Sequence, residues 1–177
     1  MIELFKNKYK IKSIRLPHWD YSSCGGYFVT ICTKNRECFF GNVSNKKMKL
    51  SQIGEIANKY WNEIPKHYKN VSLDEYILMP NHIHGIVIIE QLIPTVETPH
   101  CGVSTNTKNP HHKPQWKPNS LGSIICQFKS ITTKHVRSIG SPNFSWQSRF
   151  HEHIIRNDND LSRIRKYIKN NPVKWKI

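Results

Sequence analysis

The sequence predicts an α+β protein with a ferredoxin-like antiparallel sheet of βαββαβ order and an added C-terminal helix that carries a tyrosine. Three observations lead to this prediction. Residues 53–64 and 121–136 repeat apolar side chains with the period of an amphipathic helix. Short segments rich in β-branched and aromatic residues precede, separate and follow these two. The helical period then returns at 161–168, after the last such segment.

The first predicted strand covers residues 27–33, Tyr-Phe-Val-Thr-Ile-Cys-Thr, because such side chains suit a half-buried pleated surface. Turn residues at 41–45 separate two apolar segments and indicate a small hairpin. The first helix follows, with Ser51 as a suitable N-cap and Pro65 near its end. Its apolar stripe consists of Ile53, Ile56, Ala57, Tyr60, Trp61 and Ile64.

Two central strands are expected at 71–79 and 82–90, joined by a turn at Pro80-Asn81 and paired as an antiparallel hairpin. Residues 91–119 lose this periodicity and contain half of the chain's 10 prolines, so we expect a flexible surface loop there. The whole chain, 1–177, is expected to form a single domain.

The second helix is expected over 121–136, with Asn119 or Ser120 as its cap. Residues 146–156 form the last predicted strand. A final helix of about twelve residues begins after Asn157 or Asp158 and ends at Asn171-Pro172, because a proline cannot continue a helix.

Charge points to a polyanionic partner. The 27 Lys and Arg outnumber the 12 Asp and Glu, which gives a formal net charge of +15. Nucleic acid is the first candidate partner for such an excess, and a surface that only maintains solubility is the alternative.

The 5 cysteines include no C-x-x-C pair, which argues against a disulfide framework or a zinc ribbon. We expect a cytoplasmic, nucleoid-associated protein without a membrane-spanning segment.

Two histidines, His82 and His84, open the second central strand. Strand side chains alternate between faces, so an H-x-H pair directs both imidazoles the same way. Adjacent imidazoles are a natural beginning for a metal site, although the spacing alone favours a hydrogen-bonded pair at a strand end. A second H-x-H pair, His151 and His153, shares one face of the last strand with Arg149 and is a rival metal site.

The final helix carries the candidate nucleophile. Its apolar stripe consists of Leu161, Ile164 and Ile168. At about 100° per residue, Tyr167 and Asn171 fall on one border of this stripe, one turn apart, so both are expected at the boundary between sheet and helix. In the alternative interpretation, Tyr167 is a half-buried aromatic that completes the stripe, and Asn171 is a helix C-cap.

Basic residues surround this tyrosine. Residues 161–177 include six basic side chains and no acidic ones, which favours a helix that faces DNA over a merely solvated surface. The predicted DNA-binding residues are Lys129, Arg149, His153, Arg156, Arg163, Arg165, Lys166 and Lys169.

Taken together, these segments resemble the HUH-type tyrosine transposases, and more closely the REP-associated tyrosine transposase-like group. The matching segments extend nearly from end to end. They are YFVTICTKNR at 27–36, MPNHIHGIV at 79–87, Ser120–Ile124 leading to Phe128–Ser130, Trp146-Gln147 with Phe150 and Glu152-His153, and YIKNNP at 167–172.

The resemblance implies a role for each candidate residue. His82 and His84 match the two histidines of the HUH motif, with Ile83 as the central hydrophobic residue. Tyr167 matches the family's nucleophile, and Asn171 matches the polar residue that completes the metal shell. The family acts on one DNA strand and recognises imperfect hairpins. The implied cofactor is a divalent metal ion, Mn²⁺ or Mg²⁺.

The leading prediction is therefore a metal-dependent transesterase that cleaves and rejoins hairpin-bearing single-stranded DNA through a phosphotyrosine. One alternative is a non-catalytic module that binds structured DNA or RNA. Another is a nuclease in which metal-bound water, rather than Tyr167, attacks the phosphate. A monomer and a homodimer are both compatible with the sequence, and Tyr167 could serve its own histidine pair or that of a partner.

Overall fold

The computed structural model describes residues 19–91 and 117–175. Most of the predicted loop at 91–119 therefore lies outside the described residues. The elements are β1 (Gly25–Cys32), η1 (Lys34–Arg36), β2 (Gly41–Ser44), β3 (Lys47–Leu50), α1 (Gln52–His67), β4 (Val71–Met79), β5 (His82–Ile89), α2 (Leu121–Ser138), β6 (His151–Ile155), α3 (Asp158–Lys169) and α4 (Asn171–Lys174). No helix in these two ranges is long and apolar enough to cross a membrane.

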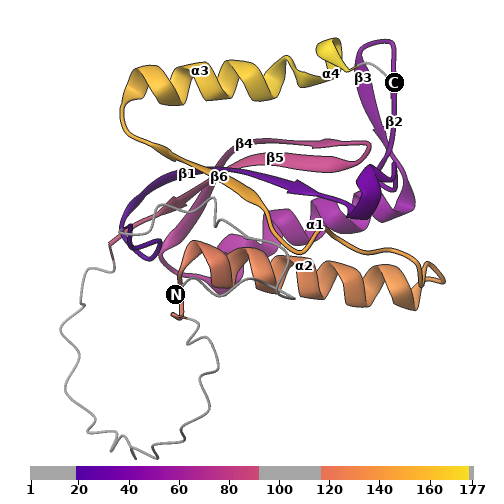
Figure 1. Ribbon diagram of the computed structural model, residues 1–177, viewed down its shortest axis with the longest axis horizontal. Coiled ribbons are helices and arrows are strands. Elements are labelled where there is room, and N and C mark those ends of the chain that lie inside the picture. Colours follow the sequence, from indigo (N-terminus) through magenta and orange to yellow (C-terminus); the bar gives the residue numbers. More distant parts are fainter. Residues whose placement is uncertain (1–18, 92–116, 176–177) are drawn as a thin grey trace, which may run out of the picture.

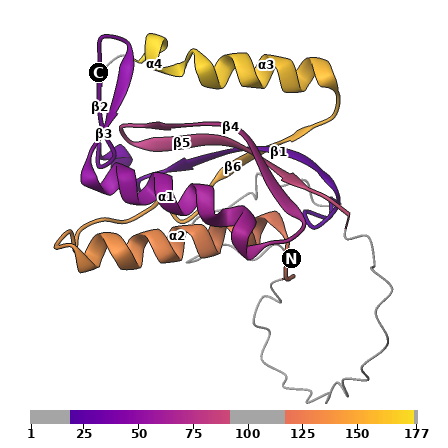
Figure 2. The same cartoon turned by 180° about the vertical axis from the view of Figure 1, so that it is seen from behind.

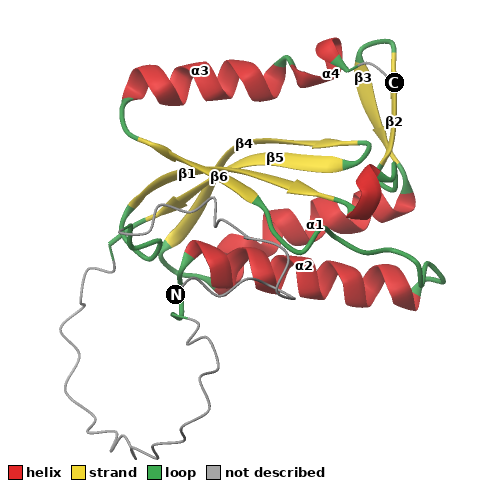
Figure 3. Ribbon diagram, in the orientation of Figure 1, coloured by secondary structure: helices red, strands yellow, loops and turns green. Residues whose placement is uncertain are grey.

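Four strands form one antiparallel sheet in the order β4-β5-β1-β6, and β2 pairs with β3 in a separate hairpin. Helices α1 and α2 cover one face of the sheet, and α3 lies across the other (Figures 1 and 3). Seen from behind, α4 continues from α3 toward the β2-β3 hairpin (Figure 2). The predicted mixed α+β class with an antiparallel sheet is confirmed.

The helix caps follow local side-chain chemistry. Ser51 accepts a hydrogen bond from the backbone of Gly54 at 3.1 Å, which begins α1 as predicted. Of the two caps considered for α2, Ser120 is the one whose side chain accepts the backbone N–H at the helix start. Asn157, rather than Asp158, caps α3. Each cap satisfies an N–H group that a helix leaves without an internal partner.

Two predicted boundaries were wrong. The strand expected over 146–156 is shorter: β6 begins at His151, and Trp146 makes only an isolated bridge with Thr33. The last helix was expected to continue to Asn171, but α3 ends at Lys169 and a separate turn, α4, follows. Pro172 explains the break, because its ring fixes φ and suits the first turn of a new helix.

Alternation along β5 gives the sheet two different cores. On the face toward α1 and α2, Ile83 and Val87 pack with the buried aromatic side chains of the main core. On the opposite face, Ile86 packs beneath Ile164 and Ile168 of α3. His82 and His84 share the face of Ile86, because they lie at even offsets from it along the strand. The histidine pair therefore lies on the side of the sheet that α3 covers.

Gly85 provides a test of the packing behind this pair. A Cβ at this position would lie 2.3 Å from Cζ2 of the buried Trp61. We expect Gly85→Ala to lower the free energy of unfolding by about 1–3 kcal/mol, because the indole must move within a packed core. Urea unfolding followed by circular dichroism measures the loss. Gly26→Ala is the matched control, since its Cβ would meet Ile155 at an ordinary 3.4 Å. Equal losses in both variants would contradict this explanation.

Candidate functional site

The histidine pair is buried and oriented by hydrogen bonds. His82 and His84 each retain 6% exposure, and their ring centroids are 4.5 Å apart. Nδ1 of His82 is 2.7 Å from Oδ1 of Asn81, and Nδ1 of His84 is 2.9 Å from Oγ1 of Thr30. In both rings Nδ1 is thus engaged by a neighbouring side chain, so Nε2 is the nitrogen that would face a metal ion, although Nε2 of His84 also contacts the Tyr167 hydroxyl.

The tautomer of His82 follows from its neighbour. The Asn81 amide donates through Nδ2 to the Arg36 carbonyl at 3.0 Å, so its oxygen faces the ring. An amide oxygen only accepts hydrogen bonds, and His82 must therefore donate from Nδ1. The lone pair then lies on Nε2, as metal coordination requires.

Both imidazoles are neutral at neutral pH. Burial, with a smaller contribution from the charge of Arg36, lowers the pKa of His82 to about 4. Burial, helped by the charges of His82, Arg36 and His151, lowers the pKa of His84 to about 3. Taking a charged ring out of water is unfavourable, so the unprotonated form dominates. Unprotonated imidazole is the form that binds a metal ion.

Tyr167 of α3 contacts His84, one member of this pair. Its Oη is 3.2 Å from Nε2 of His84, and the two rings meet edge to face at 5.2 Å. Phe28 of β1 stacks on His84 and meets the Tyr167 ring edge-on, which holds both rings in place. Tyr167 is 44% exposed. The structure therefore brings the predicted nucleophile to one predicted metal ligand and leaves the phenol accessible.

The structure places Asn171 differently from the position predicted from the sequence. The one-turn offset from Tyr167 assumed a continuous helix, but α3 ends at Lys169 and Asn171 begins α4. Within the described part of the chain, no hydrogen bond joins Asn171 to either histidine. The asparagine that lines the cavity beside Tyr167 is Asn170.

Trp175 is a site residue that sequence reasoning missed. Its ring centroid is 5.8 Å from that of His82. The residue follows α4, beyond the last element whose apolar period could be recognised. No local pattern pointed to it, because its position depends on the break at Asn170 and on the turn of α4.

A cavity of about 500 Å³ opens beside Tyr167. Both the edge strand β6 and the helix α3 contribute to it. The residues that line it are Phe28, His151, His153, Arg163, Ile164, Lys166, Tyr167, Asn170 and Lys174. Cationic side chains and one aromatic ring next to a tyrosine hydroxyl form a surface suited to a phosphate and a base.

The rival histidine pair belongs to this cavity. His151 pairs with Thr30 of β1 and His153 with Phe28, so the second pair is one strand removed from the first and on the same face. Nε2 of His153 is 2.7 Å from Oδ2 of Asp160 in the first turn of α3. This contact already occupies one nitrogen of His153, and both histidines are exposed.

The predicted DNA-binding residues separate into groups. His153, Arg163 and Lys166 lie around the cavity beside Tyr167. Arg165 and Lys169 instead form ion pairs with Asp74 and Glu75 of β4. The three others lie elsewhere. Lys129 of α2, on the other face of the sheet, donates to the Gln147 carbonyl. Arg149 and Arg156 are exposed, the first just before β6 in the chain and the second just after it.

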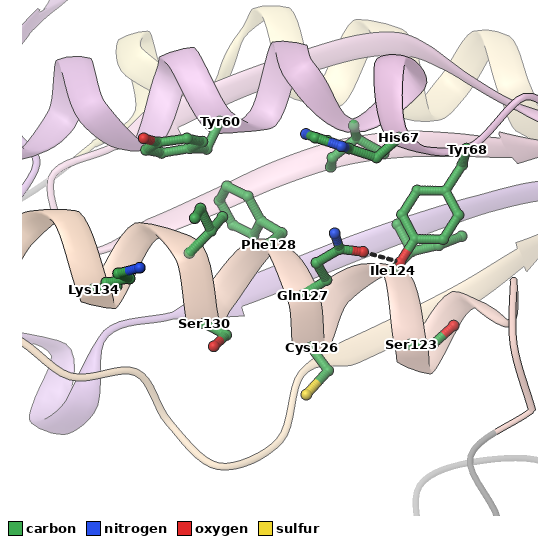
Figure 4. Close-up of a pocket in the computed structure, with 12 residues that line it drawn as sticks. Tyr60, His67, Tyr68, Ser123, Ile124, Cys126, Gln127, Phe128, Ser130 and Lys134 are labelled. Carbon is green, nitrogen blue, oxygen red and sulfur yellow. Dashed lines mark hydrogen bonds between the residues drawn. The ribbon is translucent and has the colours of Figure 1, made fainter.

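A larger cavity, about 600 Å³, lies between α1 and α2 (Figure 4). Tyr60, His67 and Tyr68 line it from the α1 side, and the Tyr68 hydroxyl donates to the Gln127 side chain. The sheet separates this cavity from the histidine pair and from Tyr167. The larger cavity is therefore not part of the candidate site.

Comparisons with known proteins address the family and the fold of the chain. No family model matches the sequence. A protein of Haemophilus influenzae, described as uncharacterized, is 38% identical over 165 residues, which cover 93% of this chain and 89% of that protein. The solved structure of a REP-associated tyrosine transposase bound to a REP hairpin has a TM-score of 0.58 and 20% identity to this chain. That match covers 93% of this chain and 74% of the transposase chain.

Proposed function

We propose a function for this chain from two premises: it belongs to the same family as the Haemophilus influenzae protein, and it shares the fold of the hairpin-bound transposase. The chain is a metal-dependent transesterase that cleaves and rejoins single-stranded DNA through a phosphotyrosine. One observation supports this proposal above all. The hydroxyl of Tyr167, a residue that is 44% exposed, lies 3.2 Å from Nε2 of His84, one of two buried and neutral histidines.

The arrangement of elements supports the finer assignment of the fold. The order β1, α1, β4, β5, α2, β6 is that of a ferredoxin-like domain. We take α3 as the addition that carries the nucleophile across the free face of the sheet. In this arrangement the rigid strand β5 holds the histidines, and a separate helix brings Tyr167 to them.

The donor set fits a divalent ion that retains open positions. Among the described residues, no group of three or more His, Cys, Asp or Glu side chains could hold a metal ion. We propose that Nε2 of His82 and Nε2 of His84 hold it, and that the Asn171 amide, which begins α4 and makes no hydrogen bond to either histidine in the part of the chain that the structure describes, joins them only once the ion is bound. The nitrogen ligands favour Mn²⁺ over Mg²⁺, which prefers oxygen. When bound, the ion supplies Lewis-acid polarisation of the scissile phosphate.

Tyr167 performs the covalent step. Its phenol oxygen attacks phosphorus and forms the Oη–P bond as the phenol proton is released to solvent, while the P–O3′ bond breaks and the 3′ oxygen takes up one proton from solvent. Lys166 and Lys174 line the same cavity, and their charges stabilise the negative charge that develops on the phenol and phosphate oxygens. The bond energy is conserved in the phosphotyrosine, so attack by another 3′-hydroxyl rejoins DNA without ATP.

The cavity beside Tyr167 receives the DNA strand. Basic side chains there neutralise phosphates, and the Phe28 ring offers a stacking surface for a base. The transposase of the same fold is bound to a REP hairpin, which supports a hairpin-bearing strand as the substrate class. Such a substrate would place the protein at the nucleoid.

The experiment uses a labelled hairpin-bearing single strand with Mn²⁺ or Mg²⁺. We expect cleavage together with a labelled protein band that survives denaturation, and both should disappear when a chelator is added. Cleavage that persists in the chelator would contradict the metal site. Cleavage without a covalent band would favour a nuclease that uses water.

The second candidate function is a non-catalytic module that binds structured DNA or RNA. It is favoured by the net charge of +15 together with the lack of a third strong metal ligand among the described residues. Tight binding of hairpins, without cleavage under any metal condition, would establish this function instead.

A further inference from the structure

Helix α3 is held to the sheet by an apolar side and by charged side chains on one border of that side. Its apolar side is narrow, with Ile164 and Ile168 buried against Ile86 of β5. Arg165 and Lys169 are four residues apart and lie on one border of the helix. Tyr167, two residues from each, is directed to roughly the opposite side. A narrow apolar contact alone leaves the rotation of such a helix about its own axis poorly determined.

The border with Arg165 and Lys169 meets an acidic pair on β4. Arg165 donates from Nε to Oδ1 of Asp74 at 2.9 Å and from Nη2 to Oδ2, which makes a two-point fork. Nζ of Lys169 is 2.7 Å from Oε1 of Glu75. Asp74 is only 12% exposed in its side chain, so this pair is less screened by solvent than a surface ion pair.

A β-bulge directs these carboxylates toward α3. The register of β4 against β5 shifts between Leu73 and Tyr76, and Asp74 and Glu75 are the two residues within the shift. Bulges bend a strand and redirect its side chains. The Glu75 backbone N–H also donates to Oδ1 of Asp74 at 2.6 Å, which orients that carboxylate. An edge strand therefore presents two oriented negative charges to the helix.

We propose that the Asp74–Arg165 and Glu75–Lys169 ion pairs position Tyr167 by setting the rotation of α3 about its axis. This inference rests on the proposed function. The Tyr167 hydroxyl is far from the helix axis, so a small rotation displaces it from His84 by a large amount. A misplacement of about 1 Å costs on the order of 100-fold in rate when two reacting groups must be aligned.

The positive charges of the C-terminal segment therefore have two roles. Arg165 and Lys169 are neutralised by β4 and act as positioning residues. Lys166 and Lys174 line the cavity beside Tyr167 and are directed to the phosphates of the strand. The sequence places these residues in one uniform basic segment, and their different roles predict different results in rate and binding measurements.

The test compares the double variant Asp74→Asn, Glu75→Gln with Lys166→Gln. For the double variant we expect single-turnover cleavage at saturating DNA to fall about 10- to 100-fold, with an unchanged salt slope for DNA binding. Amide hydrogen exchange should become faster in α3 but not in α1. Lys166→Gln should instead reduce the salt slope by about 0.7, because one phosphate contact is lost.

Two further variants separate positioning from general stability. Asp74→Arg combined with Arg165→Asp should restore much of the cleavage rate, and Arg165→Lys should be intermediate because it keeps the charge without the fork. Asp20→Asn removes an ion pair with Lys117 far from α3 and should change none of the measurements.

Several results would overturn the proposal. These are wild-type cleavage in the double variant, unchanged exchange in α3, faster exchange in α1 to the same extent, or a defect that vanishes at saturating DNA. If the wild-type protein forms no covalent adduct, the proposed function fails, whereas the exchange measurement still decides whether the ion pairs hold α3.

Discussion

Replacing Tyr167 with Phe is expected to lower strand cleavage at least about a thousandfold and to abolish the denaturation-resistant adduct. The substitution removes only Oη, the proposed nucleophile. The ring keeps its contacts with Phe28 and His84. The lost hydrogen bond to His84 is worth about 0.5–1.5 kcal/mol at most, so the fold persists. Denaturing gels with labelled DNA measure cleavage and adduct, and thermal unfolding verifies the fold.

Tyr68→Phe is the matched control for this variant. It also removes one hydrogen-bonded hydroxyl, but from the cavity between α1 and α2, on the other face of the sheet. We expect its cleavage rate to equal that of the wild type. If Tyr167→Phe cleaves as fast as Tyr68→Phe, the tyrosine mechanism is wrong, and metal-bound water becomes the better candidate for the nucleophile.

The second large effect is expected from the histidine pair. His82→Gln combined with His84→Gln removes both Nε2 atoms that we propose as metal ligands. We expect Mn²⁺ affinity to fall about 100-fold or more. Cleavage should fall at least about a thousandfold, while hairpin binding remains, because the cationic side chains of the cavity are unchanged. Titration calorimetry with Mn²⁺ alone measures the metal affinity independently of the reaction.

The rival pair provides the control. His151→Gln combined with His153→Gln alters the second H-x-H segment on β6, and Mn²⁺ affinity should remain at the wild-type level. If this variant loses the ion and the β5 variant keeps it, the metal site is on β6. The contact of His153 with Asp160 would then be the orienting interaction that Asn81 provides for His82 in our proposal.

Much of the architecture was predictable because it depends on local periodicity. The stripe from Ile53 to Ile64 and the hydroxyl of Ser51 gave the position and start of α1. Alternation in β5 placed His82 and His84 on the same face. The end of the last helix was not predictable from its stripe, because Asn170 and Pro172 interrupt a pattern whose apolar positions already stop at Ile168.

The candidate site was predictable in its parts but not in its assembly. The helical period placed Tyr167 on the border of an apolar stripe, and its contact with His84 follows only once α3 lies on that face of the sheet. Nothing near Arg165 in the sequence indicates that its partner is Asp74, because the bulge that presents this carboxylate lies about ninety residues earlier.

The sequence by itself determined which residues share a face, since periods of two and 3.6 residues arise from backbone geometry alone. It also determined the basic character of the surface. Only the tertiary structure decided which side chains meet. The distance between Tyr167 and His84, and the neutralisation of Arg165 and Lys169, depend on how α3 packs across strands far away in the chain. Such long-range packing has no local signal in the sequence, because side chains distant in the chain make the contacts that define it.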